Sequence, residues 1–342
     1  MSRVRWGVLG TARIATEKVI PALQRGRWSE VVAIASRDPG KARQAAETLG
    51  IPRAYGSYEA LLADPEIDVV YNPLPNHLHV PWSAKAAESG KHVLCEKPLG
   101  LNVAEVLELM AVRDRAGVKI GEAFMVRTHP QWLETRRLAR SGRIGEPRVV
   151  TGHFSYFKLD PENIRNRLEY GGGGLMDIGC YPINLSRFVF GEEPLRVLGL
   201  VERDPVLRID RLTSALLEFP SGHASFTCAT QLVPYQRMHV FGTAGRIEVE
   251  VPFNAPADRP CRIILDDGRD LTGAEREVVE FEVCDQYTIQ GDLFSRAVLE
   301  DTEVPVPLED SLRTMAVIEA IFRSAETGRW EPPSIDGGLQ RR

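Results

Sequence analysis

Hydrophobic and polar positions along residues 1–120 alternate in blocks that predict strands followed by helices. Short apolar runs of the kind that form buried parallel strands are separated by segments whose apolar residues recur with helical spacing. The expected strands are Val4–Leu9, Val31–Ser36, Asp68–Asn72, His92–Cys95 and Lys119–Phe124, and the expected helices are Ile14–Arg25, Pro39–Leu49, Val80–Ser89 and Val103–Ala116. This order predicts right-handed βαβ units and a parallel sheet.

The pattern changes near residue 124, where short segments of alternating apolar and polar residues become frequent. Such alternation is typical of half-buried antiparallel strands. The expected strands are Arg148–Tyr156, Ser214–Phe219, His223–Thr230, Met238–Gly242, Arg246–Val251 and Glu277–Val283, and the expected helices are Gln131–Ser141, Asp177–Phe190, Tyr287–Glu300 and Glu309–Thr327. We therefore expect an α/β domain at residues 1–123 and an α+β domain at residues 124–342.

Composition narrows the class of protein. The 342 residues are 43% hydrophobic and 26% charged, with a net charge of −5, so nothing indicates a basic nucleic-acid surface. The five cysteines are scattered without a CxxC or a zinc spacing, which predicts free thiols and no metal site. We find no signal-peptide pattern and no apolar stretch of 18 residues, and we expect a cytoplasmic protein that does not bind membranes.

The segment GVLGTARIA at Gly7–Ala15 directly follows the first expected strand and begins the first expected helix. It aligns with the dinucleotide-binding pattern G-x-G-x-x-G/A, although Ala12 stands where the second glycine is usual. A helix N-terminus offers N–H groups and a positive dipole end to a pyrophosphate. The alternative is a tight turn that binds nothing. The residues that we expect to bind the cofactor here are Gly10, Thr11, Ala12, Arg13 and Ile14.

The end of the second expected strand indicates which dinucleotide is preferred. An NAD site usually has Asp or Glu about 20 residues beyond the fingerprint, to bind the ribose 2′-hydroxyl. Here the strand ends in Ser36 and Arg37, and Asp38 follows. A hydroxyl and a guanidinium suit a 2′-phosphate, so we predict NADP in preference to NAD. The alternative is an exposed arginine that happens to follow a strand.

Three stretches together resemble the Gfo/Idh/MocA family of NAD(P)-dependent oxidoreductases. They are GVLGTARIA, the segment from Asn72 to Gly100 that ends in HVLCEKPLG, and GGGGLMDIGCYPIN at Gly171–Asn184. The resemblance covers nearly the whole chain. It implies a Rossmann domain with a parallel sheet, followed by an α+β domain built on an open, largely antiparallel sheet. It also implies a homodimer or homotetramer that associates through that second sheet.

The resemblance implies that Lys97 of the EKP motif lies at the nicotinamide, between cofactor and substrate. A cation at the carboxyl end of a strand can hydrogen-bond a reacting oxygen and stabilise charge that develops there. Pro98 would stiffen the backbone that places it. Glu96 would orient the lysine and border the cofactor. The alternative is an exposed loop lysine. The same resemblance assigns Pro75, Asn76 and His79 to the nicotinamide half of the site, although His79 could equally be a helix-cap or surface histidine.

Asp177 and Tyr181 are four residues apart, a spacing that places them on one face of a helix. Because Pro182 fits best in a first turn, we expect the helix to begin close to Tyr181. Tyrosine at this position resembles the branch of glucose–fructose oxidoreductase and dimeric dihydrodiol dehydrogenase. We predict that Tyr181 transfers the proton, that Lys97 lowers its pKa, and that Asp177 holds the lysine or a substrate hydroxyl. The alternatives are an N-cap for Asp177 and a core aromatic for Tyr181.

Three further residues are weaker candidates for substrate binding. Arg127 lies at the start of the second domain, and Arg165 lies in DPENIRNR, which resembles a substrate loop of the same branch. Arg165 could bind sugar hydroxyls or only the edge of a sheet. Tyr235 could supply an aromatic wall for a sugar.

These features predict an NADP-dependent oxidoreductase that acts on a CH–OH or C=O group of a sugar or polyol, with an aldose 1-dehydrogenase of the D-xylose or D-glucose type preferred. A 3-keto-sugar reductase or a trans-dihydrodiol dehydrogenase would use the same residues. An aldose–aldose oxidoreductase that retains its cofactor is another alternative. A non-catalytic, NADP-binding regulatory sensor is the alternative outside enzymes, and it would not need both Lys97 and Tyr181.

Overall fold

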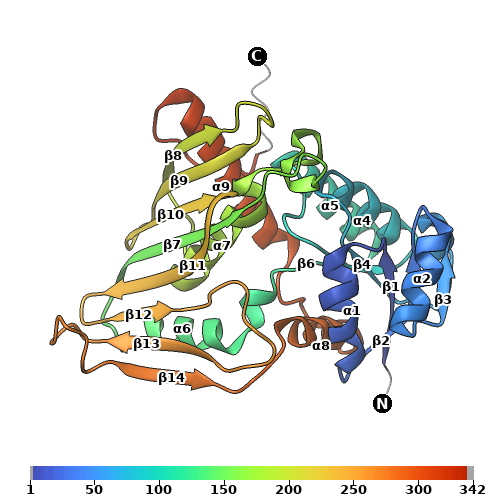
Figure 1. The fold of residues 1–342 in the computed structure, drawn as a ribbon, viewed down its shortest axis with the longest axis horizontal. Coiled ribbons are helices and arrows are strands. Elements are labelled where there is room, and N and C mark those ends of the chain that lie inside the picture. Colours follow the sequence, from blue (N-terminus) through green and yellow to red (C-terminus); the bar gives the residue numbers. More distant parts are fainter. Residues whose placement is uncertain (1–2, 337–342) are drawn as a thin grey trace. The chain divides into compact units, whose positions relative to one another are not determined.

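The computed structural model describes residues 3–336, and the chain divides into two compact units (Figure 1). The first unit contains the chain up to Met125 together with Asp285–Leu312. The second contains Val126–Cys284 and the chain from Arg313 onward. The domain boundary expected from the sequence at residue 123 differs from this division, because it leaves Asp285–Leu312 in the second domain.

The first unit contains, within residues 3–336, a six-stranded parallel sheet in the order β3-β2-β1-β4-β5-β6. The strands are β1 (Val4–Leu9), β2 (Ser29–Ala35), β3 (Arg53–Tyr55), β4 (Val69–Asn72), β5 (His92–Cys95) and β6 (Ile120–Glu122). The chain proceeds outward in one direction from β1 and then in the other from β4. In open α/β sheets a ligand binds at the carboxyl ends of the strands beside such a switch point. The parallel α/β fold expected from the sequence is confirmed.

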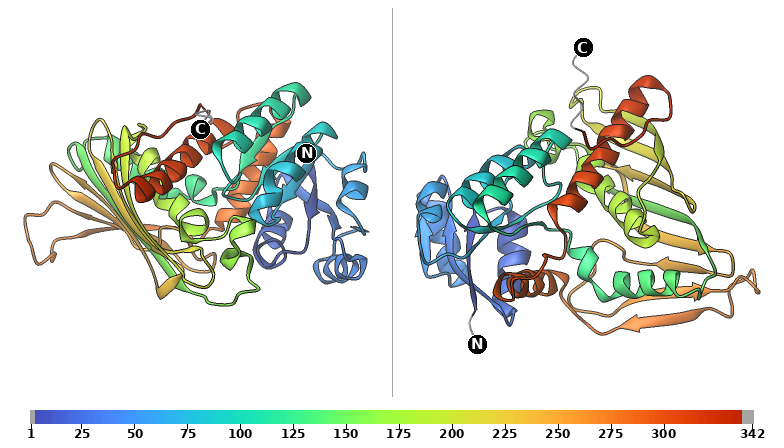
Figure 2. Two further views of the ribbon diagram at one scale, coloured as in Figure 1. Left: turned by 90° about the horizontal axis from the view of Figure 1, so that it is seen from above. Right: turned by 180° about the vertical axis from the view of Figure 1, so that it is seen from behind.

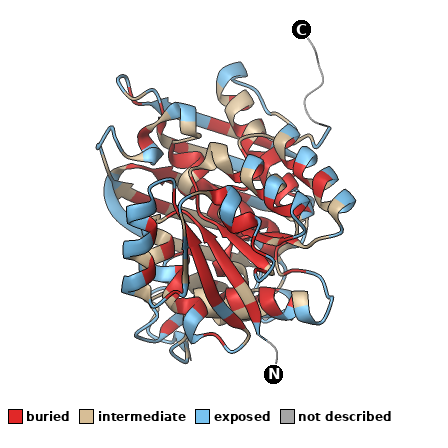
Figure 3. Cartoon of the chain, turned by 90° about the vertical axis from the view of Figure 1, so that its right-hand side faces the viewer, coloured by how far each residue is buried: buried red, intermediate tan, exposed pale blue. Residues whose placement is uncertain are grey.

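Helices surround this sheet, and Figure 3 shows its strands buried while the outer faces of the helices are exposed. The helical segments of the unit are η1 (Ala15–Val19), α1 (Ile20–Arg25), α2 (Pro39–Leu49), α3 (Tyr58–Leu62), η2 (Asn76–Leu78), α4 (His79–Glu88), α5 (Val103–Ala116) and α8 (Gln286–Leu299). The sequence pattern did not indicate β3 or α3. β3 is a three-residue edge strand without a buried residue, so it lacks the apolar run that marks a central strand.

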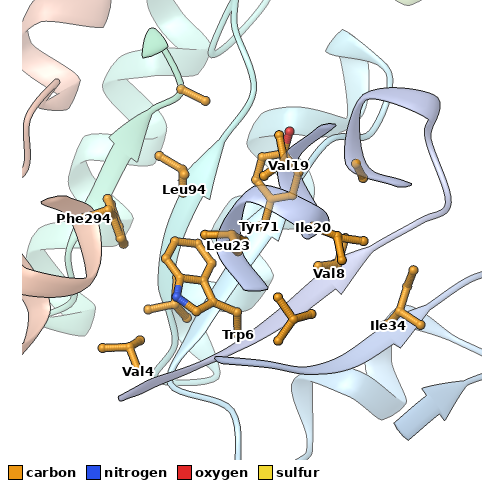
Figure 4. Packing of buried hydrophobic residues seen from close by; sticks show 14 of the residues in the cluster. Val4, Trp6, Val8, Val19, Ile20, Leu23, Ile34, Tyr71, Leu94 and Phe294 are labelled. Carbon is orange, nitrogen blue, oxygen red and sulfur yellow. The ribbon is translucent and has the colours of Figure 1, made fainter. Parts of the chain in front are cut away.

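Trp6 explains why Asp285–Leu312 belongs to the first unit. This β1 residue is fully buried, and its ring lies 5.6 Å from the ring of Phe294 on α8 (Figure 4). The Trp6 indole N–H donates to the Ser295 hydroxyl over 3.0 Å. A buried indole N–H needs such a partner, so α8 supplies both apolar contact and the required acceptor to the core of the sheet.

The second unit contains, within the described residues, an eight-stranded sheet in the order β14-β13-β12-β11-β7-β10-β9-β8. Its strands are β7 (Pro147–Phe157), β8 (Arg196–Arg203), β9 (Asp210–Glu218), β10 (His223–Ala229), β11 (Gln231–Gly242), β12 (Arg246–Val249), β13 (Cys261–Asp266) and β14 (Glu277–Phe281). β7 and β10 pair in parallel and the other neighbours are antiparallel. The expectation of a largely antiparallel sheet is confirmed, although β8 and β13 were not among the expected strands.

Helices α7 and α9 cover one face of this sheet, whereas the opposite face carries no helix from the described part of the chain (Figure 2). The helical segments here are η3 (Met125–Thr128), α6 (Pro130–Arg140), η4 (Ile164–Asn166), η5 (Leu168–Tyr170), η6 (Leu175–Gly179), α7 (Cys180–Phe190) and α9 (Leu308–Thr327). Leu200 and Leu216 of the open face are 74% and 47% exposed. None of the helices between residues 3 and 336 has the length and apolar character needed to cross a membrane.

Candidate active site

The turn after β1 has the backbone conformation that its sequence predicts. Gly10 has a φ of +83°, which favours glycine, and a Cβ atom there would lie 3.1 Å from Cδ2 of Leu74. Helical structure begins at Arg13, so the turn leads directly into a helix N-terminus. The Arg13 side chain is 85% exposed and pairs with Glu17 at 2.9 Å. This geometry suits a pyrophosphate at the backbone of the turn, and Arg13 would contribute mainly through its main chain.

Asp38, the acidic residue that follows the end of β2, is bonded to its own helix. Its carboxylate caps α2 by accepting the N–H groups of Gly40 and Lys41 at 2.8 and 3.2 Å. The Asp38 N–H in turn donates to the Ser36 hydroxyl over 3.2 Å. A carboxylate that caps its own helix is not available to receive a ribose 2′-hydroxyl without losing these bonds. The residues present at this strand end therefore fit a 2′-phosphate.

Arg37 lies beside the phenol of Tyr58, the first residue of α3. Burial raises the pKa of Tyr58, and the neighbouring Arg37 guanidinium partly offsets this rise. The Tyr58 hydroxyl is also 3.5 Å from the point where a Cβ of Gly10 would lie. Arg37 is therefore placed near the turn after β1, at the end of β2, which neighbours β1 in the sheet.

His79 is buried at the start of α4 and contacts the backbone of two loops. Its Nδ1 lies 2.7 Å from the Pro98 carbonyl oxygen and its Nε2 lies 2.6 Å from that of Leu74. Burial is the main cause that lowers the pKa of His79 to about 4, so the ring is neutral at physiological pH and donates to one carbonyl at a time. The imidazole thus joins the loop after β4 to the EKP loop. Pro75 and Asn76 lie between these contacts, at the start of η2.

The EKP motif directly follows β5, as predicted, and its backbone is held on both sides of Lys97. The Tyr71 hydroxyl donates to Oε1 of Glu96 over 2.7 Å, and the Lys97 N–H approaches Oε2 of the same carboxylate at 3.3 Å. On the other side, the Pro98 carbonyl oxygen lies 2.7 Å from Nδ1 of His79. Lys97 is therefore placed by fixed neighbours at the carboxyl edge of the parallel sheet.

Glu122, at the end of β6, was not among the residues predicted from the sequence. It is 4% exposed, and its Oε1 accepts the Leu99 N–H over 2.8 Å. Burial raises the pKa of Glu122 to about 7, while the Leu99 N–H and the charge of Lys97 act in the opposite direction. A glutamate that ends an apolar strand beside the EKP strand was a signal in the sequence that could have indicated it.

Asp177 lies inside a helix rather than before one, which corrects the expected helix start near Tyr181. The turn η6 begins at Leu175, and the Cys180 N–H bonds to the Leu175 carbonyl five residues earlier. The helix then continues as α7 through Pro182. This π-type turn is wider than an α-helical turn, and it accommodates a proline that would otherwise interrupt the bonding pattern. Asp177 is consequently not an N-cap.

The Asp177 carboxylate joins two side chains from other elements of the second unit. The Tyr156 hydroxyl of β7 and the Arg165 Nε of η4 both donate to Oδ2, at 2.7 and 3.0 Å. The pKa of Arg165 is raised, chiefly by Asp177 and also by Tyr156 and Tyr181. Burial and Asp177 raise the pKa of Tyr156. The structure thus brings together the predicted Asp177, Tyr181 and Arg165, and adds Tyr156, which the strand pattern alone did not indicate.

Tyr181 is 5% exposed and packs against two phenylalanines. Its ring centroid lies 5.9 Å from that of Phe154 on β7 and 5.5 Å from that of Phe253. Phe154 and Tyr156 are two residues apart on β7 and therefore point to the same face of the sheet. The aromatic contacts fix the Tyr181 ring on the face that carries Asp177.

Asp210 holds the glycine run that precedes Asp177, and the sequence analysis did not identify this aspartate. Its Oδ2 accepts the Leu175 N–H over 2.6 Å. Gly173 has a φ of +118°, and a Cβ there would lie 1.9 Å from Oδ1 of Asp210. The Gly173 N–H also donates to the Arg165 carbonyl over 2.9 Å. Glycine is therefore required at Gly173 so that Arg165, Asp210 and the start of η6 can approach one another.

The remaining two predicted substrate residues are placed differently. Arg127 donates to the Asn184 side chain over 3.0 Å and lies 4.3 Å from the Phe188 ring. It therefore contacts the part of α7 that is C-terminal to Tyr181. Tyr235 pairs in register with Ser155 and contacts the ring of His153. Since neighbouring residues of β7 alternate between faces, Tyr235 lies on the face opposite Phe154. The structure does not bring Tyr235 to Tyr181, which corrects its expected place beside the same substrate.

Comparisons with known proteins agree with this architecture. Residues 4–124 match the model of the oxidoreductase family with an NAD-binding Rossmann fold, and residues 132–248 match that of the GFO/IDH/MocA C-terminal domain. An uncharacterized oxidoreductase of Rhizobium meliloti is 51% identical, with 97% of this chain and 99% of the relative covered. The D-xylose 1-dehydrogenase (NADP(+)) 2 of Haloferax volcanii is 40% identical, with 94% and 98% covered.

Solved structures also resemble this chain over almost the full length of both proteins. The aldose–aldose oxidoreductase of Caulobacter crescentus, crystallised with glycerol, superimposes with a TM-score of 0.88 at 29% sequence identity. The match covers 96% of this chain and 99% of the other.

Proposed function

Because the chain belongs to the Gfo/Idh/MocA family of oxidoreductases, we propose that it is an NADP-dependent sugar dehydrogenase. The proposed reaction oxidises the C1 hydroxyl of an aldose of the xylose or glucose type to the lactone. The 40% identity to a D-xylose 1-dehydrogenase over 94% of this chain supports this class of substrate. NADP, when bound, accepts the hydride that leaves C1.

In the proposed reaction, two residues act on the reacting hydroxyl group. Tyr181 accepts the hydroxyl proton as the carbon–hydrogen bond breaks, and Lys97 donates a hydrogen bond to the same oxygen. The products are the lactone, the reduced cofactor and a proton on the Tyr181 phenol, so atoms and charge balance.

The observation that most supports this proposal is the cluster around Asp177. Arg165 donates to Asp177 over 3.0 Å, and the pKa of Arg165 is raised chiefly by Asp177 and to a smaller extent by Tyr181. A cation beside a tyrosine favours the phenolate, which is the form that can remove a proton from an alcohol. A carboxylate and a guanidinium next to a tyrosine are also suited to hydrogen-bonding several hydroxyl groups, as a sugar requires.

We propose NADP as the preferred cofactor. The carboxylate of Asp38 caps α2, and Arg37 and Ser36 remain at the end of β2 to bind a 2′-phosphate. Equal catalytic efficiency with NAD and NADP would contradict this preference.

A second candidate function is transfer of hydride between two sugars by a protein that keeps its cofactor. The similarity to a solved aldose–aldose oxidoreductase favours it. Such a protein would purify with NADP bound, absorb at 340 nm after addition of an aldose, and lose that absorbance after addition of a second sugar. A dehydrogenase would instead require added NADP and release NADPH at each turnover.

We also propose that the protein forms a homodimer or homotetramer through the open face of the second sheet. β8 and β9 place Leu200 and Leu216 on this face, where each is substantially exposed. Exposed apolar side chains that adjoin on one face are typical of interaction surfaces. Light scattering on the wild type and on Leu200→Lys would test this: the wild-type mass should be a multiple of the chain mass, and the variant should shift toward the monomer.

The experiment that tests the function is spectrophotometry at 340 nm with NADP or NAD and a panel of aldoses, polyols and trans-diols. Reduction of NADP by a pentose or hexose, with formation of a lactone, is the expected result. Activity with trans-diols but with no sugar would refute an aldose dehydrogenase.

A further inference from the structure

Glu122 has contacts that the proposed reaction does not use. It ends β6, next to β5 in the parallel sheet, and the EKP loop follows β5. Its Oε1 accepts the Leu99 N–H at 2.8 Å, two residues beyond Lys97. Its Oε2 is buried, and a hydrogen bond with the Ser311 side chain lowers the pKa of the carboxyl. A buried carboxylate is costly and needs compensating interactions.

The charges around Glu122 suggest what these interactions are. Asp310 at the start of α9 raises the pKa of Glu122, and Lys97 lowers it, as does the side chain of Ser311. His79, on the other side of the EKP loop, is neutral at physiological pH because burial lowers its pKa to about 4. Glu96 is bonded to Tyr71. Among the groups named here, Lys97 is the cation whose charge Glu122 senses.

We propose that Glu122 is a positioning residue for Lys97, because it holds the Leu99 backbone with one oxygen and stabilises the Lys97 ammonium with its charge. Electrostatic coupling is reciprocal, so a carboxylate whose proton affinity Lys97 lowers must favour the protonated lysine by the same free energy. Ionisation of Glu122 near neutral pH would then set the lower pH limit at which Lys97 is held for catalysis. This inference rests on the proposed function of Lys97.

The direct test measures the protonation of Lys97 without turnover. The full-length protein is labelled with trace acetic anhydride over a range of pH, and modification is quantified in the tryptic peptide His92–Arg113, in which Lys97 is the single lysine. Trypsin does not cleave before Pro98, so labelled and unlabelled forms give the same peptide. Glu122→Gln keeps an acceptor for the Leu99 N–H but loses the charge. The Glu122→Gln substitution should lower the pH at which labelling of Lys97 is half-maximal, its labelling midpoint, by about 0.5 to 1 pH unit.

Glu105→Gln is the matched control. Glu105 accepts the N–H of Leu101, in the same loop, over 2.8 Å, so the variant removes a similar carboxylate from a similar backbone contact. Its labelling midpoint should equal that of the wild type. An unchanged midpoint in Glu122→Gln, or an equal shift in Glu105→Gln, would overturn the proposal.

A kinetic measurement separates this inference from the proposed function. An inactive Lys97→Met variant would support the proposed function of Lys97. In that case we expect the pH profile of kcat/KM to show an inflection near pH 7 in the wild type and to lack it in Glu122→Gln. If Lys97→Met is inactive but both profiles coincide, Glu122 does not position Lys97. If Lys97→Met retains full activity, the proposed function of Lys97 fails, while the labelling result still decides whether Glu122 and Lys97 are coupled.

Discussion

Nε of Arg165 lies 3.0 Å from Oδ2 of Asp177, and this contact links the short helix η4 to the helical turn η6. The Arg165 side chain is 44% exposed, whereas the Asp177 side chain is 13% exposed. The carboxylate is thus the more buried partner of this ion pair, and the arginine lies between it and solvent. A substrate that replaced part of this contact would find a fixed acceptor in Asp177 and a donor in Arg165 that can rearrange.

Replacing Lys97 by methionine should remove catalysis while leaving the cofactor bound. The methionine keeps most of the side-chain volume but cannot donate to the reacting oxygen, so we expect kcat to fall by about 100-fold or more. Titration of NADPH fluorescence should give a dissociation constant close to that of the wild type. Lys119→Met, which removes a lysine paired with Asp301, is the control and should keep its turnover. Turnover near the wild-type value in Lys97→Met would disprove the assignment.

Replacing Arg37 by alanine should weaken NADP binding much more than NAD binding. A hydrogen-bonded ion pair to a phosphate contributes about 1.5–3 kcal/mol, so KM for NADP should rise about 10- to 100-fold. Arg43→Ala, at an exposed position of α2, provides a comparison for the general loss of positive charge. If both cofactors were affected equally by Arg37→Ala, the reason for preferring NADP would disappear.

Replacing Gly173 by alanine should destabilise the second unit. The φ of +118° is unfavourable for alanine, and the added Cβ would overlap Asp210, so the free energy of unfolding should fall by about 1–3 kcal/mol. Gly268→Ala is a suitable control, because Gly268 also has a positive φ of +70° but has open space where a Cβ would lie. Urea denaturation should show the larger loss for Gly173→Ala; equal losses would contradict the packing argument.

Glu122 should make stability depend on pH in a predictable direction. Burial raises its pKa from 4.5 to about 7. Between these values the folded protein keeps a proton that the unfolded chain releases, so stability falls as pH rises through this range. The full loss is about 3 kcal/mol. Glu122→Gln lacks this ionisation, so urea denaturation at pH 4.5 and pH 8 should show a smaller decline than in the wild type. Identical declines would contradict a buried Glu122 with a raised pKa.

The sequence predicted the parallel sheet well because its central strands are buried on both faces. The runs that contain β1 and β5 are almost entirely apolar and have no other plausible structure. Edge strands carry a weaker signal. β3 has no fully buried residue, and β8 contains Gly199, whose Cβ position would be only 2.7 Å from the Ile321 carbonyl oxygen. That glycine reflects close packing by α9, which no local pattern reveals.

The candidate site could be predicted only in part, for a similar reason. Lys97 and Tyr181 belong to motifs that can be identified from neighbouring residues in the chain. Tyr156 and Asp210 reach the glycine run and Asp177 from strands distant in sequence, so their roles depend on tertiary contacts. Proline led to the wrong helix start at Tyr181, because local rules do not anticipate a π-type turn that accommodates Pro182.

The most direct test of the central claim is kcat for Tyr181→Phe with NADP and the best aldose, compared with Tyr235→Phe. The Phe variant of Tyr181 keeps the packing against Phe154 and Phe253 but has no hydroxyl to accept a proton. We predict that its kcat falls by about 100-fold or more. Tyr235→Phe, on the opposite face of the sheet, should remain close to the wild type. A Tyr181→Phe variant with wild-type kcat would contradict the proposed role of Tyr181 in proton transfer.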